Sequence, residues 1–144
     1  MRPMPKRSAG AELQGVPLFS ALSKRDLKTV EQAADRIEVP AGREVVSEGR
    51  TGHEFFLILD GKASVKRGNR KVAGLGPGDY FGEMAVLDQG PRTATVVADT
   101  DMNLLVLGQR EFAGLINTVP GLAGKLMRSL AGRLRDADAK SIRH

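Results

Sequence analysis

The central part of the chain, residues 43–107, consists of short β-rich runs separated by glycine, asparagine, aspartate and proline. Runs this short, punctuated this regularly, are typical of a small antiparallel sandwich or barrel. Asp60-Gly61 and Gly68-Asn69 have the composition of hairpin turns. We expect strands over residues 44–47, 55–59, 63–66, 71–75, 93–98 and 103–107.

Helical patterns flank this region on its N-terminal side. Residues 12–19 predict one short helical turn. Ser23 has the position of an N-cap, and the apolar residues that follow recur at helical spacing, which predicts a helix over 24–36. The sequence Pro40-Ala41-Gly42 would close that helix.

Two more helices are predicted after Gly108. The first covers 109–118, and the second has Pro120 in its first turn and reaches about residue 139. A leucine every fourth residue gives the last helix an apolar stripe, which packs on the core or forms a dimer seam or docking face. The expected fold is mainly β with flanking helices: an antiparallel β-roll or jelly roll (double-stranded β-helix) with an N-terminal helix and two C-terminal helices.

The length of 144 residues is enough for one compact domain. Residues 1–10 contain two prolines and no apolar periodicity, so we expect a disordered N-terminal segment there. The single domain is expected to cover 11–140, and 141–144 would be a tail.

Composition excludes several classes of function. The chain has no cysteine, which rules out disulfides, thiolate metal sites and cysteine nucleophiles, and its two histidines cannot form a histidine metal cluster. A net charge of +5 is too modest to indicate a nucleic-acid-binding protein. The longest apolar run, residues 55–59, falls far short of the roughly 20 residues of a membrane span. With no signal-peptide core either, we expect a cytoplasmic protein without membrane contact.

The most informative segment is Phe81-Gly82-Glu83-Met84-Ala85 and its continuation to Val96. Gly82 permits close approach of the backbone, and residues 83–87 could form a helical turn whose free N–H groups make an anion site. Arg92 adds a planar, permanently charged fork that suits a phosphate.

Two polar side chains refine this expectation. Glu83 can only accept hydrogen bonds, so beside a phosphate it needs a donor such as a ribose hydroxyl. Thr93 can donate to a phosphate oxygen or reach a base. Together these residues indicate a nucleotide with one phosphate charge and a free 2′-hydroxyl.

The same segment resembles the phosphate-binding cassette of the cyclic nucleotide-binding domain family. That cassette has Phe-Gly-Glu, a short apolar helix, a loop, and then Arg, a small residue and Ala-Thr-Val. The run from Phe56 to Ala63 is similar to the family's central hairpin, and the resemblance covers residues 16–139. It relates the chain to the sensor domains of catabolite activator-type regulators, cAMP-dependent protein kinase regulatory subunits and cyclic nucleotide-gated channels.

The resemblance assigns roles to individual residues. It implies that Glu83 accepts from the ribose 2′-hydroxyl and that Arg92 pairs with the cyclic phosphate. Thr93 would contact either purine. The remaining implied ligand contacts are backbone groups of the cassette and two residues of the last helix over the purine: Gly82, Met84, Ala85, Leu130 and Arg133.

These roles imply a regulatory sensor that binds cAMP, or cGMP, without a metal and answers through its C-terminal helices. A protein effector or a homodimer through those helices would be its partner, with no direct nucleic-acid contact. The alternative is a truncated sensor part of a larger cyclic-nucleotide-regulated transcription factor, channel or enzyme.

Plainer interpretations exist for the same residues. Arg92 could be a surface ion-pair residue, Glu83 an acid favoured by a helix N-terminus, and Arg133 a solvated cation. A fourth interpretation is an interaction domain that binds no ligand. The presence of both Glu83 and Arg92 argues against it. Catalysis is not expected, because hydrolysis of a cyclic phosphate needs metals or a base that the sequence does not offer.

Overall fold

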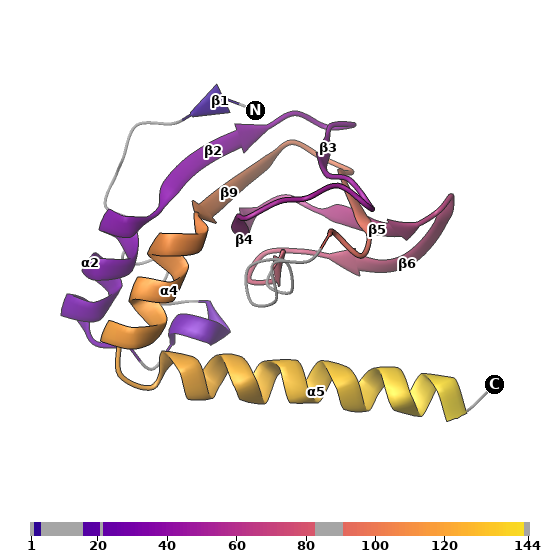
Figure 1. Ribbon diagram of the computed structural model, residues 1–144. Helices are drawn as coiled ribbons and strands as arrows, with labels where there is room; N and C mark the ends of the chain where they lie inside the picture. The colour runs from indigo at the N-terminus through magenta and orange to yellow at the C-terminus, as the bar shows by residue number, and fades with distance from the viewer. Residues whose placement is uncertain (1, 4–15, 21, 83–90, 143–144) are drawn as a thin grey trace.

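Two antiparallel sheets enclose a β-roll, and helices cover one end and one side of it (Figure 1). This computed structural model describes residues 2–3, 16–20, 22–82 and 91–142, with the backbone alone for 133–142. The first sheet has the order β1 (Arg2–Pro3), β2 (Asp35–Val39), β9 (Met102–Leu107), β4 (Phe55–Asp60), β7 (Tyr80–Phe81). The second has the order β3 (Glu44–Val46), β8 (Thr95–Ala98), β5 (Ala63–Arg67), β6 (Arg70–Leu75). The predicted mainly β roll is confirmed.

Strand β4 is buried on both faces, which explains its unbroken apolar sequence. Side chains alternate across a sheet, so Phe55 and Leu57 join a core cluster on the side of the helices. Phe56 and Ile58 join a second cluster inside the roll. The five-stranded sheet therefore separates two cores.

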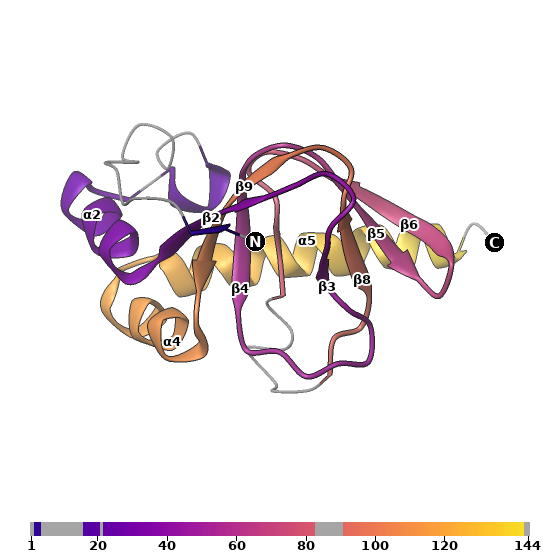
Figure 2. The ribbon, with the colours of Figure 1, turned by 90° about the horizontal axis from the view of Figure 1, so that it is seen from above.

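The helices of the described residues lie where the sequence predicts them, apart from the C-terminal end of the helix predicted over 24–36. They are η1 (Pro17–Phe19), α2 (Lys24–Ala33), α4 (Gln109–Thr118) and α5 (Leu122–Ile142). The helical turn predicted over 83–87 falls outside the described residues. Ser23 caps α2 as expected, because its Oγ accepts from the Asp26 N–H at 3.1 Å. From above, α5 runs behind both sheets along the length of the roll, while α2 and α4 lie beside one end (Figure 2).

The predicted helix over 24–36 is wrong at its C-terminal end. It ends at Ala33, Ala34 is already extended, and Asp35–Val39 forms strand β2. The register pairs β2 with β9 from Asp35 opposite Val106 to Val39 opposite Met102. Sheet pairing at this position overrides a local helical pattern.

The prediction of a hairpin at Asp60-Gly61 is also wrong. Strands β4 and β5 belong to different sheets, so this turn carries the chain from one sheet to the other. Gly61 has φ +96°, and a Cβ there would lie 2.4 Å from the Asp101 carbonyl oxygen. The hairpin predicted at Gly68-Asn69 does join paired strands, β5 and β6.

Smaller differences occur at the ends of elements. Arg2–Pro3 pairs with β2, which differs from the disorder predicted for these two residues. Helix α5 begins two residues after Pro120, following Gly121 at φ +80°, and its backbone continues through Ile142 into the predicted tail. The short strand β7 is not among the predicted strands.

Candidate functional site

A cavity of about 480 Å³ opens at one end of the roll. Its apolar wall comes from β2, β3, β4 and β9. Its polar rim comes from the loop between β3 and β4, from Arg92 before β8, and from Asp35 at the start of β2. A concave apolar wall with a few convergent polar groups is typical of a small-molecule site, for which volumes run from about 300 to 1,000 Å³. The described lining residues are Asp35, Ile37, Val45, Val46, Ser47, Arg50, Thr51, Gly52, Glu54, Phe56, Arg92 and Val106.

Arg92 is the buried charge of this cavity, with a side chain only 6% exposed. Its Nη1 donates to the Gly82 carbonyl oxygen at 3.2 Å, and its Nη2 donates to the Glu54 carbonyl oxygen at 3.1 Å. The guanidinium carbon lies 5.8 Å from the centre of the Phe56 ring. A buried cation needs such partners, because it has lost its hydration.

The main chain around Arg92 is held on both sides. The Arg92 N–H donates to the Arg50 carbonyl oxygen at 2.9 Å, and the Arg92 carbonyl accepts from the Gly49 N–H at 2.8 Å. Thr51 and Pro91 form a β-bridge between the same two segments. The loop between β3 and β4 therefore fixes where the guanidinium lies.

Two glycines make the slot that receives the guanidinium. A Cβ at Gly52 would lie 2.5 Å from both Nε and Nη2 of Arg92, closer than any real contact. Gly82 has φ +87°, and a Cβ there would lie 2.6 Å from the Glu54 carbonyl oxygen and 2.7 Å from Arg92 Nη1. Gly82 therefore requires the absence of a side chain, and at Gly52 a side chain would require the guanidinium to move.

Glu54 supplies a carboxylate that contacts Arg92. Its Oε2 lies 3.3 Å from Arg92 Nη2, and its side chain is 50% exposed. Sequence analysis missed Glu54 and Gly52. The available signal was their place in the loop that leads into the apolar run of β4, together with the cation, Arg92, predicted for the site.

The structure brings together Gly82 and Arg92, as predicted from the sequence. Thr93 lies at an exposed bend directly after Arg92. The predicted contacts of Glu83, Met84 and Ala85 fall outside the described residues, and so does the side chain of Arg133.

Leu130 occupies a different environment from the cavity. It packs, partly buried, against the cluster on the helix side of the sheet. No residue of α5 lines the cavity in the described part of the chain. The predicted contact of Leu130 with a purine stays a prediction.

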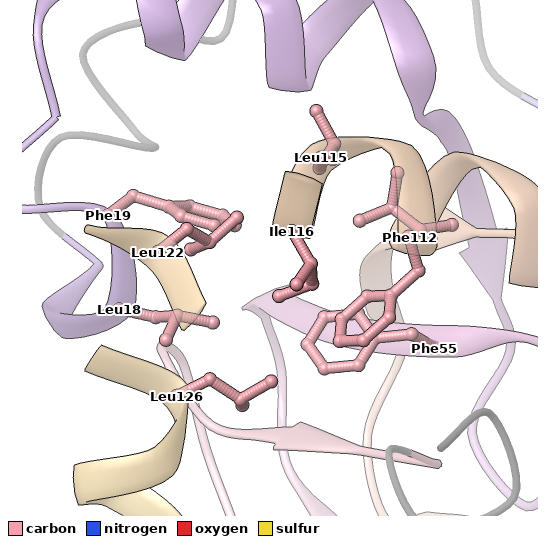
Figure 3. Close-up of a pocket in the computed structure, with 9 residues that line it drawn as sticks. Leu18, Phe19, Phe55, Phe112, Leu115, Ile116, Leu122 and Leu126 are labelled. Atoms are coloured by element: carbon pink, nitrogen blue, oxygen red, sulfur yellow. The ribbon is translucent and has the colours of Figure 1, made fainter. Parts of the chain in front are cut away.

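The helix-side cluster links α5 to the sheet (Figure 3). Leu122 and Leu126 of α5 face Phe55 of β4 across a space that η1 and α4 close. The void there is about 10 Å³, at the limit for one water molecule, so this is a packing seam. Farther along α5, the Tyr80 hydroxyl donates to Ser129 Oγ at 2.5 Å, which joins β7 to α5.

Two other kinds of site were sought over the described residues. No group of three or more histidine, cysteine, aspartate or glutamate side chains there could hold a metal ion. None of the helices in that part of the chain is both long and apolar enough to cross a membrane.

Comparison with known proteins gives consistent matches. The family model described as "Cyclic nucleotide-binding domain" matches residues 36–119. The "Cyclic AMP receptor protein" of Thermus thermophilus is 36% identical over 131 residues, which cover 88% of this chain and 61% of that protein. A cAMP-dependent protein kinase regulatory subunit of Hypocrea atroviridis is 34% identical over 110 residues, 76% of this chain and 24% of that protein.

Structural similarity agrees with these sequence matches. The crystal structure of the Thermus thermophilus Catabolite Activator Protein is similar with a TM-score of 0.79 at 36% identity, covering 86% of this chain and 61% of that one. The chain thus spans about three fifths of the first relative and about a quarter of the second.

Proposed function

Because the chain belongs to the cyclic nucleotide-binding domain family, we propose that the cavity beside Arg92 binds a cyclic purine nucleotide monophosphate. The observation that carries this proposal is the buried guanidinium of Arg92 in the cavity wall, held by main-chain carbonyls of two separate segments. A cyclic phosphate is a monoanion, which matches a permanent cation that is poorly hydrated. The relatives whose printed names include cyclic AMP favour cAMP, and cGMP is the second candidate.

The rest of the nucleotide is assigned to the residues after β7. Glu83 would accept from the ribose 2′-hydroxyl, and backbone groups of Gly82, Met84 and Ala85 would line the ribose phosphate. Gly82 supports this assignment, because its carbonyl already contacts Arg92 and places the start of the segment at the cation. Thr93 follows Arg92 directly and would donate to the ligand.

The proposed output is a change in the position of α5. Tyr80 precedes the segment by two residues and is hydrogen-bonded to Ser129 of α5, so a shift of β7 reaches the helix directly. The ligand shifts α5 only as far as it binds one state better, and each tenfold preference is worth about 1.4 kcal/mol. Leu130 and Arg133 would then cover the purine.

The protein partner of the proposed sensor would contact α5. Met127 of this helix is 69% exposed, which offers an apolar contact to an effector or to a second copy. A second candidate function is the sensor part of a larger regulator. In the Thermus thermophilus relative, the part that matches this chain makes up 61% of the protein.

Calorimetry with cAMP and cGMP tests the proposal, using the wild type, Arg92→Ala and the exposed-arginine control Arg110→Ala. We expect one site per chain in the wild type and in the control. Removal of the guanidinium should weaken binding at least about tenfold, because a charge-assisted phosphate contact is lost. Equal binding by wild type and Arg92→Ala would contradict the phosphate role.

A further inference from the structure

The Glu54 carboxylate contacts Nη2 of Arg92, the nitrogen that a bidentate contact with a phosphate requires. A guanidinium offers five N–H donors in a rigid plane, and its two bidentate edges are Nε with Nη2 and Nη1 with Nη2. Both edges include Nη2. Nη2 donates both to the carbonyl oxygen of Glu54 at 3.1 Å and to its Oε2 at 3.3 Å.

One of these two contacts must be released before a phosphate can bind in a bidentate manner. The Glu54 carbonyl belongs to the main chain that enters strand β4, so it is fixed with the sheet. The carboxylate is half exposed, whereas the Arg92 side chain is 6% exposed. Rotation of the Glu54 side chain into water therefore removes the carboxylate contact from Nη2 without moving the cation.

The carboxylate also compensates the buried charge before a ligand arrives. A buried cation that loses its counter-ion is strongly destabilised, whereas an ion pair with a half-exposed partner adds little stability of its own. The pair is thus tight enough to hold the guanidinium in its slot and weak enough to be exchanged for another anion.

We propose that Glu54 sets the affinity of the site: its carboxylate occupies Arg92 in the ligand-free protein, and the phosphate of the ligand displaces it. This inference rests on the proposed function for the identity of the ligand. It rests on the geometry of Glu54 and Arg92 for the competition itself.

The test compares Glu54→Gln with the control Asp60→Asn, which removes one negative charge from the other, exposed end of the same strand. By calorimetry with cAMP, Glu54→Gln should bind about three- to tenfold more tightly than the wild type, and Asp60→Asn should stay within about twofold. Glu54→Ala should change affinity in the same direction. Unchanged or weaker binding by both Glu54 variants would overturn the proposal.

A second measurement separates this inference from the proposed function. Inorganic phosphate should raise the thermal unfolding temperature of Glu54→Gln more than that of the wild type, and the gain should vanish in Arg92→Ala/Glu54→Gln. If the wild type binds neither nucleotide but this pattern holds, the proposed function fails and the competition stands. An equal phosphate effect in wild type and Glu54→Gln would refute the competition.

Discussion

Phe55 and Phe56 are neighbours in the sequence but belong to opposite faces of one sheet. Phe55 packs on Phe112 and Tyr80, with ring centres 4.7 and 5.5 Å away, inside the helix-side core. Phe56 stacks on Phe81 at 4.9 Å and lies beneath the guanidinium of Arg92. The helix-side core holds a void of about 10 Å³, whereas the roll opens into a cavity of about 480 Å³.

Strand β4 packs on the helices with one face and borders the cavity with the other. On the helix side, close packing joins η1, α4 and α5 to the sheet. On the roll side, incomplete filling leaves space beside a fixed cation. Strands β4 and β7 contribute to both faces, so the proposed response to a ligand would reach the helices without a separate connecting element.

The largest expected effect in this comparison is on stability. Phe55→Ala and Phe56→Ala should each lower the free energy of unfolding by about 3–5 kcal/mol, because both side chains are almost fully buried. Chemical denaturation measures both values. A loss below about 1 kcal/mol at either position would show that the surrounding core relaxes to fill the cavity or is not closely packed in the wild type.

The milder substitutions Phe55→Leu and Phe56→Leu then separate the two faces by ligand binding. Phe56→Leu should weaken cAMP binding about fivefold, because Arg92 loses the ring beneath it. Phe55→Leu should leave binding within about twofold, since its ring lies on the other face. Equal losses from both would contradict the separation of the two faces.

A next prediction concerns the slot on the cavity side. Gly52→Ala introduces a methyl group 2.5 Å from the Arg92 guanidinium, so the cation must move and cAMP binding should fall at least about tenfold. Gly74→Ala is the matched control, because its nearest contact, the Lys71 Nζ, is 4.0 Å away. Calorimetry on both variants tests this, and tight binding by Gly52→Ala would show that the guanidinium position is not required.

The smallest effect is expected at the hydrogen bond between β7 and α5 on the helix side. Tyr80→Phe removes the hydroxyl that donates to Ser129, at a cost of about 0.5–1.5 kcal/mol. Affinity for cAMP should change little, but the ligand-induced change in hydrogen exchange along α5 should shrink. Ser129→Ala should behave in the same way. An undiminished exchange response in both variants would exclude this hydrogen bond as the route to α5.

Local patterns predicted much of the fold, because most strands here are bounded by turn residues and the helices begin at or after a serine, glycine or proline. Ser23, the hairpin at Gly68-Asn69 and helix α4 are examples. Strand β2 could not be predicted in this way, since its state depends on pairing with β9, which lies more than 60 residues later.

The candidate site was predictable in one part only. Gly82 and Arg92 lie ten residues apart in a recognisable pattern, and the structure joins them. Glu54 and Gly52 lie about 40 residues before Arg92, and closure of the roll brings them to it. Their roles follow from the position of the guanidinium, which no local sequence pattern specifies.

A crystal structure of the protein with cAMP tests the central claim most directly. The account predicts the cyclic phosphate in the cavity, within about 3 Å of Arg92 nitrogens including Nη2. It also predicts that the Glu54 carboxylate has turned away into solvent while its carbonyl still accepts from Arg92. A nucleotide bound elsewhere, or a phosphate in the cavity without contact to Arg92, would contradict the account.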